Sequence, residues 1–365
     1  MKVAQICATF FGKASVIGGA ERYVLELSRH ISRHVEVSII TFSRNDPRLV
    51  VERDAGLEIR RYPVKYFVKG HTANPINIAF LKDLRGFDVL HCYGYPHVVS
   101  DLTIAFAKLY RKKLFVTDIG GGGVCLSTYL SKVGFDTRRF IGGFLLLSAY
   151  SAQAYRPYLQ RVRVIYGGVD TEFFRPLELA RDPRVLFVGR LISAKGINYL
   201  VEAVDSSTPL RVVGQPYDEG YFRMLRKMAR GKAVEFFTDS LDRDLVREYS
   251  SAVVTVVPSV ITDVYGSEAP GELLNLVALE SMACGTPVIA SKCGALPEVV
   301  EDGVTGILVP PGDPDALREK IRFLLERPET ARAMGVAGRE RVLRQFTWDR
   351  VTTRCLQAYR EALET

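Results

Sequence analysis

Two glutamates eight positions apart are the residues of this chain best placed for chemistry on hydroxyl groups. Glu272 and Glu280 lie in segment 266–290, where an apolar run leads into a Gly-Thr-Pro turn. The apolar spacing predicts a helix over 273–284, on which positions eight apart differ by only about 80° around the axis. Both carboxylates can then border one cleft, accept hydrogen bonds from vicinal hydroxyls, and lie near the phosphate-attracting N–H groups of the first turn. The spacing fits two carboxylates that bind a sugar and a ribose. It fits equally well two residues without a binding role, in which Glu272 complements the helix dipole and Glu280 is solvated.

Two cations follow a buried strand earlier in the same half of the chain. Residues 185–188 are apolar, Gly189 and Arg190 come next, and Lys195 stands in the loop before an amphipathic helical pattern. Parallel α/β sheets bind ligands at the carboxyl ends of their strands, and Arg and Lys placed there suit a diphosphate. Taken alone, these two cations are more often solvated surface charge.

The order of these motifs resembles that of the retaining glycosyltransferases of family four, which have the GT-B architecture. The order is strand, Gly-Arg-x4-Lys-Gly, Glu-x7-Glu and Gly-x-Pro-Val-Ile-Ala. Three more segments resemble the family: the glycine loop and helix start at 18–22, the link at 162–176, and the start of the last helix at 346–349. The resemblance covers nearly the whole chain. It implies an α/β fold of two Rossmann-like domains with parallel sheets facing each other across a cleft.

Length and periodicity agree with two α/β domains. The chain has 365 residues, of which 47% are hydrophobic, enough for two sizeable cores. Strand-like runs alternate with helical patterns in both halves, which indicates parallel sheets. With the roles that the resemblance implies, we expect an acceptor-binding domain over 1–176, a nucleotide-sugar-binding domain over 177–343, and a C-terminal helix over 344–365 that packs back on the N-terminal domain.

The resemblance also implies roles for particular residues. Arg190 and Lys195 would neutralise the diphosphate leaving group, Glu272 would bind hydroxyls of the transferred sugar, and Glu280 would bind the ribose. The catalytic candidates are Arg190, Lys195, Glu272 and Asp118. The substrate-binding candidates are Gly18, Gly19, His91, Gly189, Leu273, Leu274, Asn275 and Glu280.

The resemblance further implies a site that needs no metal or other cofactor, with Arg190 and Lys195 in the place of a cation. A metal-dependent transferase would show an Asp-x-Asp motif after a strand. The tripeptides of this type at 242–244 and 313–315 precede helical patterns instead, as caps and first-turn charges do. The six cysteines have neither metal-ligand nor Cys-x-x-Cys spacing, so we expect reduced, mostly structural thiols and a cytoplasmic location.

The chain departs from the family pattern at several positions near the expected site. Ile119 stands where many relatives have a histidine, which leaves Asp118 or the backbone of the four glycines at 120–123 as candidate substitutes. His91 remains, either as an active residue or as a packed histidine at a strand end. Asn275 replaces a glycine, and about nine additional residues precede the first glutamate. These departures concern the identity of the donor more than the fold.

Positive charge is concentrated in the N-terminal half. Residues 1–176 hold 25 Lys and Arg against 14 Asp and Glu, a net of +11, whereas the rest holds 24 against 27 and the whole chain is +8. A basic acceptor domain suits a phosphorylated lipid or an anionic membrane surface, and clusters at 60–61, 111–113 and 138–139 are candidates for that face. A solvated basic surface explains the charge equally well. Nucleic acid is not expected as a partner, because no recognition motif accompanies the charge.

These observations together predict a retaining glycosyltransferase that moves a hexose-type sugar from a nucleotide-diphosphate sugar to an acceptor hydroxyl. A lipid-linked or glycan acceptor is favoured. No apolar run approaches 18 residues and no signal-peptide pattern opens the chain, so a cytoplasmic protein, peripheral on the membrane face, is expected. The alternatives are a catalytically silent GT-B module that binds nucleotide sugars, and a synthase or phosphorylase of soluble sugars. A nicotinamide dehydrogenase is disfavoured because no Gly-x-Gly-x-x-Gly follows the first strand.

Overall fold

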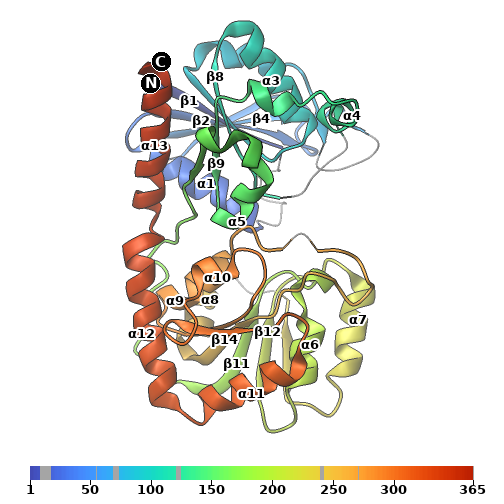
Figure 1. Cartoon of the computed structure of the whole chain (residues 1–365), viewed down its shortest axis with the longest axis vertical. Coiled ribbons are helices and arrows are strands. Elements are labelled where there is room, and N and C mark those ends of the chain that lie inside the picture. The colour runs from blue at the N-terminus through green and yellow to red at the C-terminus, as the bar shows by residue number, and fades with distance from the viewer. Residues whose placement is uncertain are drawn as a thin grey trace. The chain divides into compact units, whose positions relative to one another are not determined.

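The computed structural model describes residues 1–8, 18–54, 56–68, 74–120, 125–238, 242–269 and 271–364. The chain divides into two compact units, shown in Figure 1: unit 1 comprises 1–168 with 348–365, and unit 2 comprises 169–347. The divisions at 168/169 and 347/348 compare with 176/177 and 343/344 in the sequence analysis. Each unit has one large, mainly parallel sheet with helices packed against it, which is the Rossmann-like pattern.

Unit 1 is built on an eight-stranded sheet with the order β10-β9-β8-β7-β1-β2-β4-β3. Its strands are β1 (Lys2–Cys7), β2 (Glu36–Ser43), β3 (Val50–Asp54), β4 (Leu57–Pro63), β7 (Val89–Tyr93), β8 (Lys113–Thr117), β9 (Gly143–Leu146) and β10 (Val162–Val164). The ladders are parallel except that of β3 and β4, where Val51 is opposite Arg60. Because only parallel strands were expected, this antiparallel edge strand is a correction. The chain reverses at a turn with Gly56 at φ +85°, a conformation that glycine adopts readily.

The helices of unit 1 pack an apolar core against this sheet. They are α1 (Gly19–Ser32), α2 (Phe80–Asp83), α3 (Val98–Tyr110), α4 (Leu126–Lys132), α5 (Ala149–Ala152) and α13 (Trp348–Glu364), with 3-10 turns η2 (Leu84–Gly86), η3 (Thr137–Phe140) and η4 (Gln153–Arg161). Fully buried Ile6, Phe42 and Phe144 lie in the core. A separate two-stranded ribbon joins β5 (Tyr66–Phe67) and β6 (Pro75–Ile76).

Unit 2 has a six-stranded sheet with the order β13-β12-β11-β14-β15-β16, and its ladders are parallel. The strands are β11 (Asp182–Val188), β12 (Leu210–Val213), β13 (Val234–Phe237), β14 (Ala252–Val257), β15 (Val288–Ser291) and β16 (Gly306–Val309). This order is the doubly wound one, in which the strand order reverses between β11 and β14. Ligands of such sheets bind at the carboxyl ends of the strands beside that reversal.

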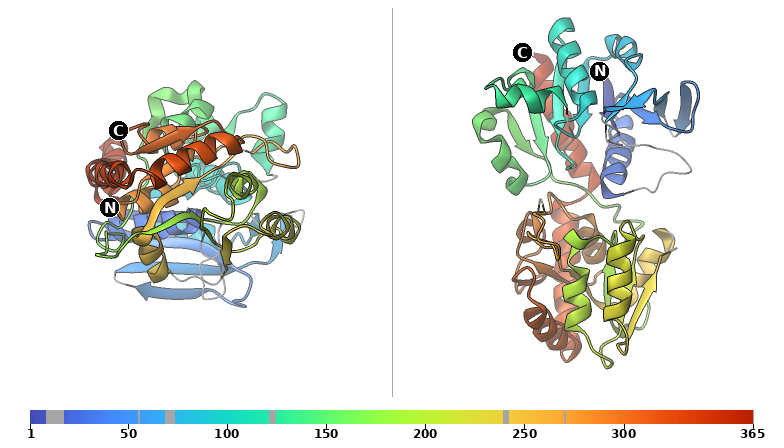
Figure 2. Two further views of the ribbon diagram at one scale, coloured as in Figure 1. Left: turned by 90° about the horizontal axis from the view of Figure 1, so that it is seen from below. Right: turned by 90° about the vertical axis from the view of Figure 1, so that its right-hand side faces the viewer.

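The helices of unit 2 pack against its sheet. They are α6 (Ile197–Ala203), α7 (Glu219–Met228), α8 (Asp242–Ser251), α9 (Leu276–Ala283), α10 (Leu296–Val299), α11 (Pro314–Leu325) and α12 (Pro328–Gln345), with the 3-10 turn η5 (Ser193–Lys195). Helix α8 packs on β11 and β14 at the reversal of the strand order, and α11 and α12 pack on the outer strand β16. In Figure 2, α6 and α7 lie side by side against the sheet. They contribute Leu200 and Leu225 to a core that also contains Val185 and Ile289.

The last helix, α13, returns to unit 1. Its Trp348 ring meets the Tyr23 ring of α1 edge-on, with 5.5 Å between centroids, and stacks on the His30 ring at 6.1 Å. Arg163 at the sheet edge forms an ion pair with Glu361. Among the described residues, no helix is both long and apolar enough to cross a membrane.

Candidate active site

An ion pair between Lys195 and Glu272 lies at the strand reversal of unit 2. Lys195 ends the η5 turn that follows β11, and its Nζ is 2.5 Å from Glu272 Oε1. Ser259, two residues after β14, donates to the same oxygen at 2.6 Å. Burial raises the pKa of Glu272, but the Lys195 charge and the hydrogen bonds outweigh it and hold that pKa below its ordinary value. The carboxylate therefore stays ionised in a half-buried place.

Two glycines with left-handed backbones bring these segments together. A Cβ on Gly294, at φ +57°, would lie 2.4 Å from the Glu272 N and 2.5 Å from its O, and Ala295 N donates to that O at 2.7 Å. A Cβ on Gly196, at φ +63°, would lie 2.0 Å from Pro258 O. Only glycine avoids both clashes, so the backbone around the ion pair is closely specified.

The helix after Glu272 begins three residues later than the sequence analysis predicted. α9 starts at Leu276, and the Asn275 side chain caps it by accepting from Ala278 N at 2.9 Å. Glu272, Leu273 and Leu274 therefore precede the helix, and the 80° separation expected on one helical face does not apply. The prediction was wrong because apolar spacing alone outweighed the strong preference of asparagine for the N-cap.

Glu280 lies inside α9 and is buried, with 5% of its surface exposed. Its Oε2 accepts from the hydroxyl of Tyr249 on α8 at 2.9 Å. The structure therefore shows a buried carboxylate with a phenol partner. Its contact with ribose stays a prediction.

Arg190 is exposed just beyond β11. Its guanidinium carbon is 5.6 Å from the centroid of the Tyr217 ring. Gly189, also predicted to bind substrate, is packed against the next loop, since a Cβ on Gly214 would lie 1.8 Å from Gly189 O. Arg190 and Lys195 therefore follow the same strand, but their surroundings differ: one contacts an aromatic ring and the other a carboxylate.

In unit 1, Asp118 lies just after β8 and is internally bonded. Its Oδ1 accepts from Gly120 N at 2.9 Å and its Oδ2 accepts from the Tyr155 hydroxyl at 3.0 Å. Burial raises the pKa of Asp118, and these hydrogen bonds only partly oppose that effect. Neighbouring Ile119 is half-buried. The three glycines at 121–123 and Val124, which follow, lie outside the described residues.

Gly18 and Gly19 stand at the start of α1. Gly18 N donates to the Glu21 side chain at 2.9 Å, and the helix begins at Gly19. The N–H of Gly18 is therefore occupied by a capping carboxylate in this structure. A phosphate or acceptor contact at these glycines stays a prediction, and a contact through the Gly18 N–H requires Glu21 to release it.

His91, on β7, is held by protein partners on both sides of its ring. The side chain is 0% exposed, and its Nε2 is 2.8 Å from Thr117 Oγ1, which itself donates to Leu145 O. Nε2 therefore carries the hydrogen, and Nδ1 accepts from the Tyr359 hydroxyl of α13 at 2.6 Å. Burial lowers the pKa of His91 to about 3, so the ring is neutral. Both nitrogens therefore have protein partners, and the predicted contact of His91 with substrate stays a prediction that requires one of them to be released.

Four of the seven cations in the basic clusters at 60–61, 111–113 and 138–139 are held by partners inside unit 1. Arg60 pairs with Glu58 and Asp83, and Arg61 pairs with Glu52 and Asp46. Lys112 Nζ donates to the carbonyls of Arg85 and Phe87, and Arg138 pairs with Asp136. These clusters therefore offer less free positive charge than their sequences suggest. In unit 2, Asp313 of the second Asp-x-Asp tripeptide caps α11 by accepting from Ala316 N.

Sequence reasoning missed three contributors to this region. Ser259 bonds Glu272, Tyr249 bonds Glu280, and Gly294 fixes the Glu272 backbone. Ser259 had a usable signal, because it directly follows a strand pattern on the side where such sheets bind ligands. Tyr249 and Gly294 had none, since their contacts depend on tertiary packing.

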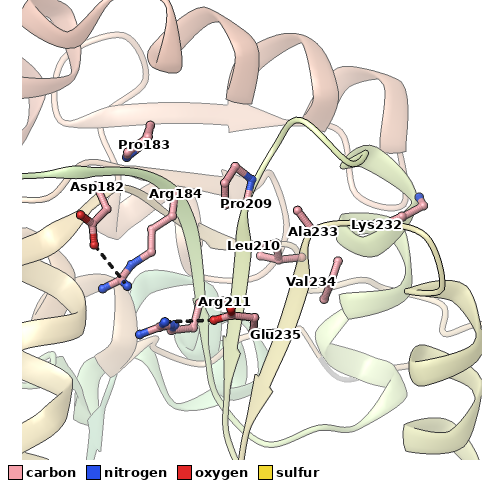
Figure 3. A pocket seen from close by; sticks show the side chains of 10 residues that line it. All are labelled: Asp182, Pro183, Arg184, Pro209, Leu210, Arg211, Lys232, Ala233, Val234 and Glu235. Carbon is pink, nitrogen blue, oxygen red and sulfur yellow. Dashed lines mark hydrogen bonds and ion pairs between the residues drawn. The ribbon is translucent and has the colours of Figure 1, made fainter.

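A cavity of about 520 Å³ lies in unit 2 near the amino ends of β11, β12 and β13, whereas the Lys195–Glu272 pair lies at the carboxyl ends of the strands (Figure 3). Asp182 and Arg184 form an ion pair beside it, as do Arg211 and Glu235. It is lined by Asp182, Pro183, Arg184, Pro209, Leu210, Arg211, Lys232, Ala233, Val234 and Glu235. None of the predicted catalytic or substrate-binding residues lines it.

Comparison with known proteins decides the family. The family described as "Glycosyl transferases group 1" matches residues 169–341, and "Glycosyltransferase Family 4" matches residues 17–173. The α-maltose-1-phosphate synthase of Mycolicibacterium smegmatis is 30% identical over 74% of this chain and 74% of its own. The chain belongs to glycosyltransferase family four. The D-inositol 3-phosphate glycosyltransferase of Frankia alni is 28% identical over 95% of both chains.

This family-four glycosyltransferase has the same fold as several solved structures. Sucrose-phosphate synthase from Thermosynechococcus elongatus matches with a TM-score of 0.76 and 24% identity over 100% of this chain and 99% of its own. Anabaena HepE, solved with UDP and glucose, matches with a TM-score of 0.77 and 17% identity over 99% of this chain and 100% of its own. The α/β GT-B fold class with two Rossmann-like domains is thereby confirmed.

Proposed function

We propose that this glycosyltransferase moves a hexose-type sugar from a nucleotide-diphosphate sugar to an acceptor hydroxyl, with retention of anomeric configuration and without a metal. The Lys195–Glu272 pair at the strand reversal of unit 2 is the observation that carries the proposal. It provides a cation for phosphate and a carboxylate for sugar hydroxyls at the edge where such sheets bind nucleotides.

The proposed chemistry follows from these two groups and Arg190. The acceptor oxygen bonds to the anomeric carbon on the face that the leaving group vacates, while the bond from that carbon to the diphosphate oxygen breaks. The acceptor proton passes to the departing phosphate. Lys195 and Arg190 stabilise the negative charge that develops there, and loss of one such contact typically costs about 3 kcal/mol in the barrier.

The nature of the acceptor separates two candidates. We favour a lipid-linked or glycan acceptor bound by the N-terminal unit, with the protein in the cytoplasm at the membrane face. The second candidate is a synthase of soluble sugars, and the names of two similar proteins support it, α-maltose-1-phosphate synthase and sucrose-phosphate synthase.

Thermal unfolding in the presence of nucleotides tests the donor site. UDP, GDP, ADP, CMP and dTDP, and their common sugar conjugates, are each added with and without EDTA. A rise in Tm with one nucleotide family that EDTA leaves unchanged supports the proposal and identifies the base. A rise that EDTA removes contradicts metal independence. Donor binding without any transfer to lipid, glycan or soluble acceptors favours a catalytically silent module.

A matched pair of variants sharpens this test. Lys195→Gln removes the ammonium from the proposed site, whereas Lys320→Gln removes one from an exposed pair with Glu319 on α11. The first variant is expected to lose the nucleotide-induced rise in Tm and the second to keep it. Equal responses of both would place the donor elsewhere.

A further inference from the structure

Helix α4 in unit 1 presents apolar side chains to solvent. Leu126 and Tyr129 lie on the helix and Val133 is its C-cap residue. Their spacing of i, i+3 and i+7 places them on one side, and Leu126 and Val133 are 61% and 79% exposed. Phe135 continues the exposed stripe beyond the helix. Figure 1 shows α4 beside α3 at the margin of unit 1. An ordinary surface helix turns its apolar face to the core and its polar face to solvent, and α4 has the opposite arrangement.

The inward side of α4 is held by polar contacts. Ser127 is buried, and its N and Oγ both donate to the Asp101 carboxylate of α3. Cys125 at the N-cap is buried as well. The helix is therefore fixed with its apolar face outward, and a simple rotation toward the core would break the Asp101 contacts.

Two cations border the exposed apolar stripe. Lys132 Nζ is 5.8 Å from the centroid of the Tyr129 ring, and the Arg139 guanidinium carbon is 4.1 Å from that of Phe135. In the described part of the chain, neither Lys132 nor Arg139 forms an ion pair. The one acidic residue of segment 126–139, Asp136, is already paired with Arg138. The surface therefore combines apolar area with unneutralised positive charge.

We propose that this α4 surface, consisting of Leu126, Tyr129, Lys132, Val133, Phe135 and Arg139, docks on an anionic lipid bilayer. The apolar side chains would enter the boundary between headgroups and acyl chains, while the long Lys132 and Arg139 side chains reach back to the lipid phosphates. Contact with a second copy through the same surface is disfavoured, because it would bring like charges together. The inference is independent of the donor chemistry, although it agrees with a lipid-linked acceptor.

Co-sedimentation of the full chain with lipid vesicles tests the proposal. We expect binding to vesicles of phosphatidylcholine mixed with phosphatidylglycerol to exceed binding to phosphatidylcholine alone by at least about fivefold, and to weaken as salt screens the charges. Inorganic phosphate at matched ionic strength should not displace the protein, which separates a bilayer from a free phosphate as the ligand. Equal binding of the wild-type protein to vesicles with and without phosphatidylglycerol would overturn the proposal.

Paired variants locate the surface. Leu126→Ser with Val133→Ser, and separately Lys132→Gln with Arg139→Gln, should each lower the bound fraction by about fivefold or more. Val51→Ser, on the exposed edge strand β3, and Arg33→Gln, at the end of α1, are the matched controls and should bind as wild type. Unchanged binding by both double variants, or loss of a dimer in them by light scattering, would contradict the proposal. Nucleotide binding, measured without vesicles, reports separately on the donor site.

Discussion

Lys195 and Glu272, 77 positions apart in sequence, form an ion pair that joins the turn after β11 to the segment before α9. The two side chains are 21% and 12% exposed, so solvent screens their attraction less than it screens a surface pair. The pair fixes both proposed contacts of the donor, the phosphate cation and the sugar carboxylate, relative to each other.

Separate neutralisation of each partner is the first prediction. Lys195→Gln and Glu272→Gln should each lower kcat/KM by at least about tenfold, because the remaining charge is left without its partner and one donor contact is lost. The double variant should be about as impaired as the worse single variant, since the two residues act together. Steady-state kinetics with the donor found by thermal unfolding measures the effect. A loss of kcat/KM in the double variant equal to the product of the two single losses would show that the residues act independently.

The second prediction concerns Glu280. Glu280→Ala should weaken donor binding by about tenfold or more if the carboxylate binds ribose, and it should also lower Tm because the Tyr249 hydroxyl loses its partner. Tyr249→Phe is the control, because it removes the same hydrogen bond but keeps the carboxylate. Nucleotide titration of both variants separates the effects. Equal loss of affinity in the two would assign Glu280 to stability rather than to ribose.

The third prediction concerns the close approach at Gly294. Gly294→Ala should destabilise the protein by at least about 3 kcal/mol and impair turnover, because its Cβ would displace the Glu272 backbone. Gly303→Ala has a similar left-handed φ of +74° with no neighbour within 4 Å, so it should cost only about 1 to 2 kcal/mol of backbone strain. Urea unfolding and kcat measure the two changes. Similar losses for both variants would mean that contact with Glu272 matters little.

The fourth prediction is a pH dependence from His91. Its pKa is about 3 in the folded chain, against an ordinary value of 6.5, so below 6.5 the unfolded chain binds a proton that the folded chain excludes. The free energy of unfolding should therefore fall as pH drops from 6.5 toward 3, by at most roughly 5 kcal/mol from this residue. His91→Gln should show a shallower slope over that window in urea titrations. An unchanged slope would mean that other groups govern the dependence.

The parallel α/β sheets and the family could be predicted from the sequence, because strand patterns and motifs are local features. Gly189 and Arg190 directly follow β11, and Lys195 lies in the turn after them, so their place at its carboxyl end could be predicted. The start of α9 could not be placed from apolar spacing, since the Asn275 cap decides it. The role of His91 depends on Tyr359, which is 268 positions away, and no local pattern reports such a contact.

The return of α13 to unit 1 bears on how the chain is made. Residues 169–347 of unit 2 are contiguous, and all of them are synthesised before Tyr359. During translation, unit 2 can complete its sheet while unit 1 still lacks α13 and leaves the Nδ1 of His91 without its phenol donor. The unit that begins the chain is thus the one that finishes folding last. Loss of the final two turns on a truncated message would remove Tyr359 and leave His91 without this hydrogen bond.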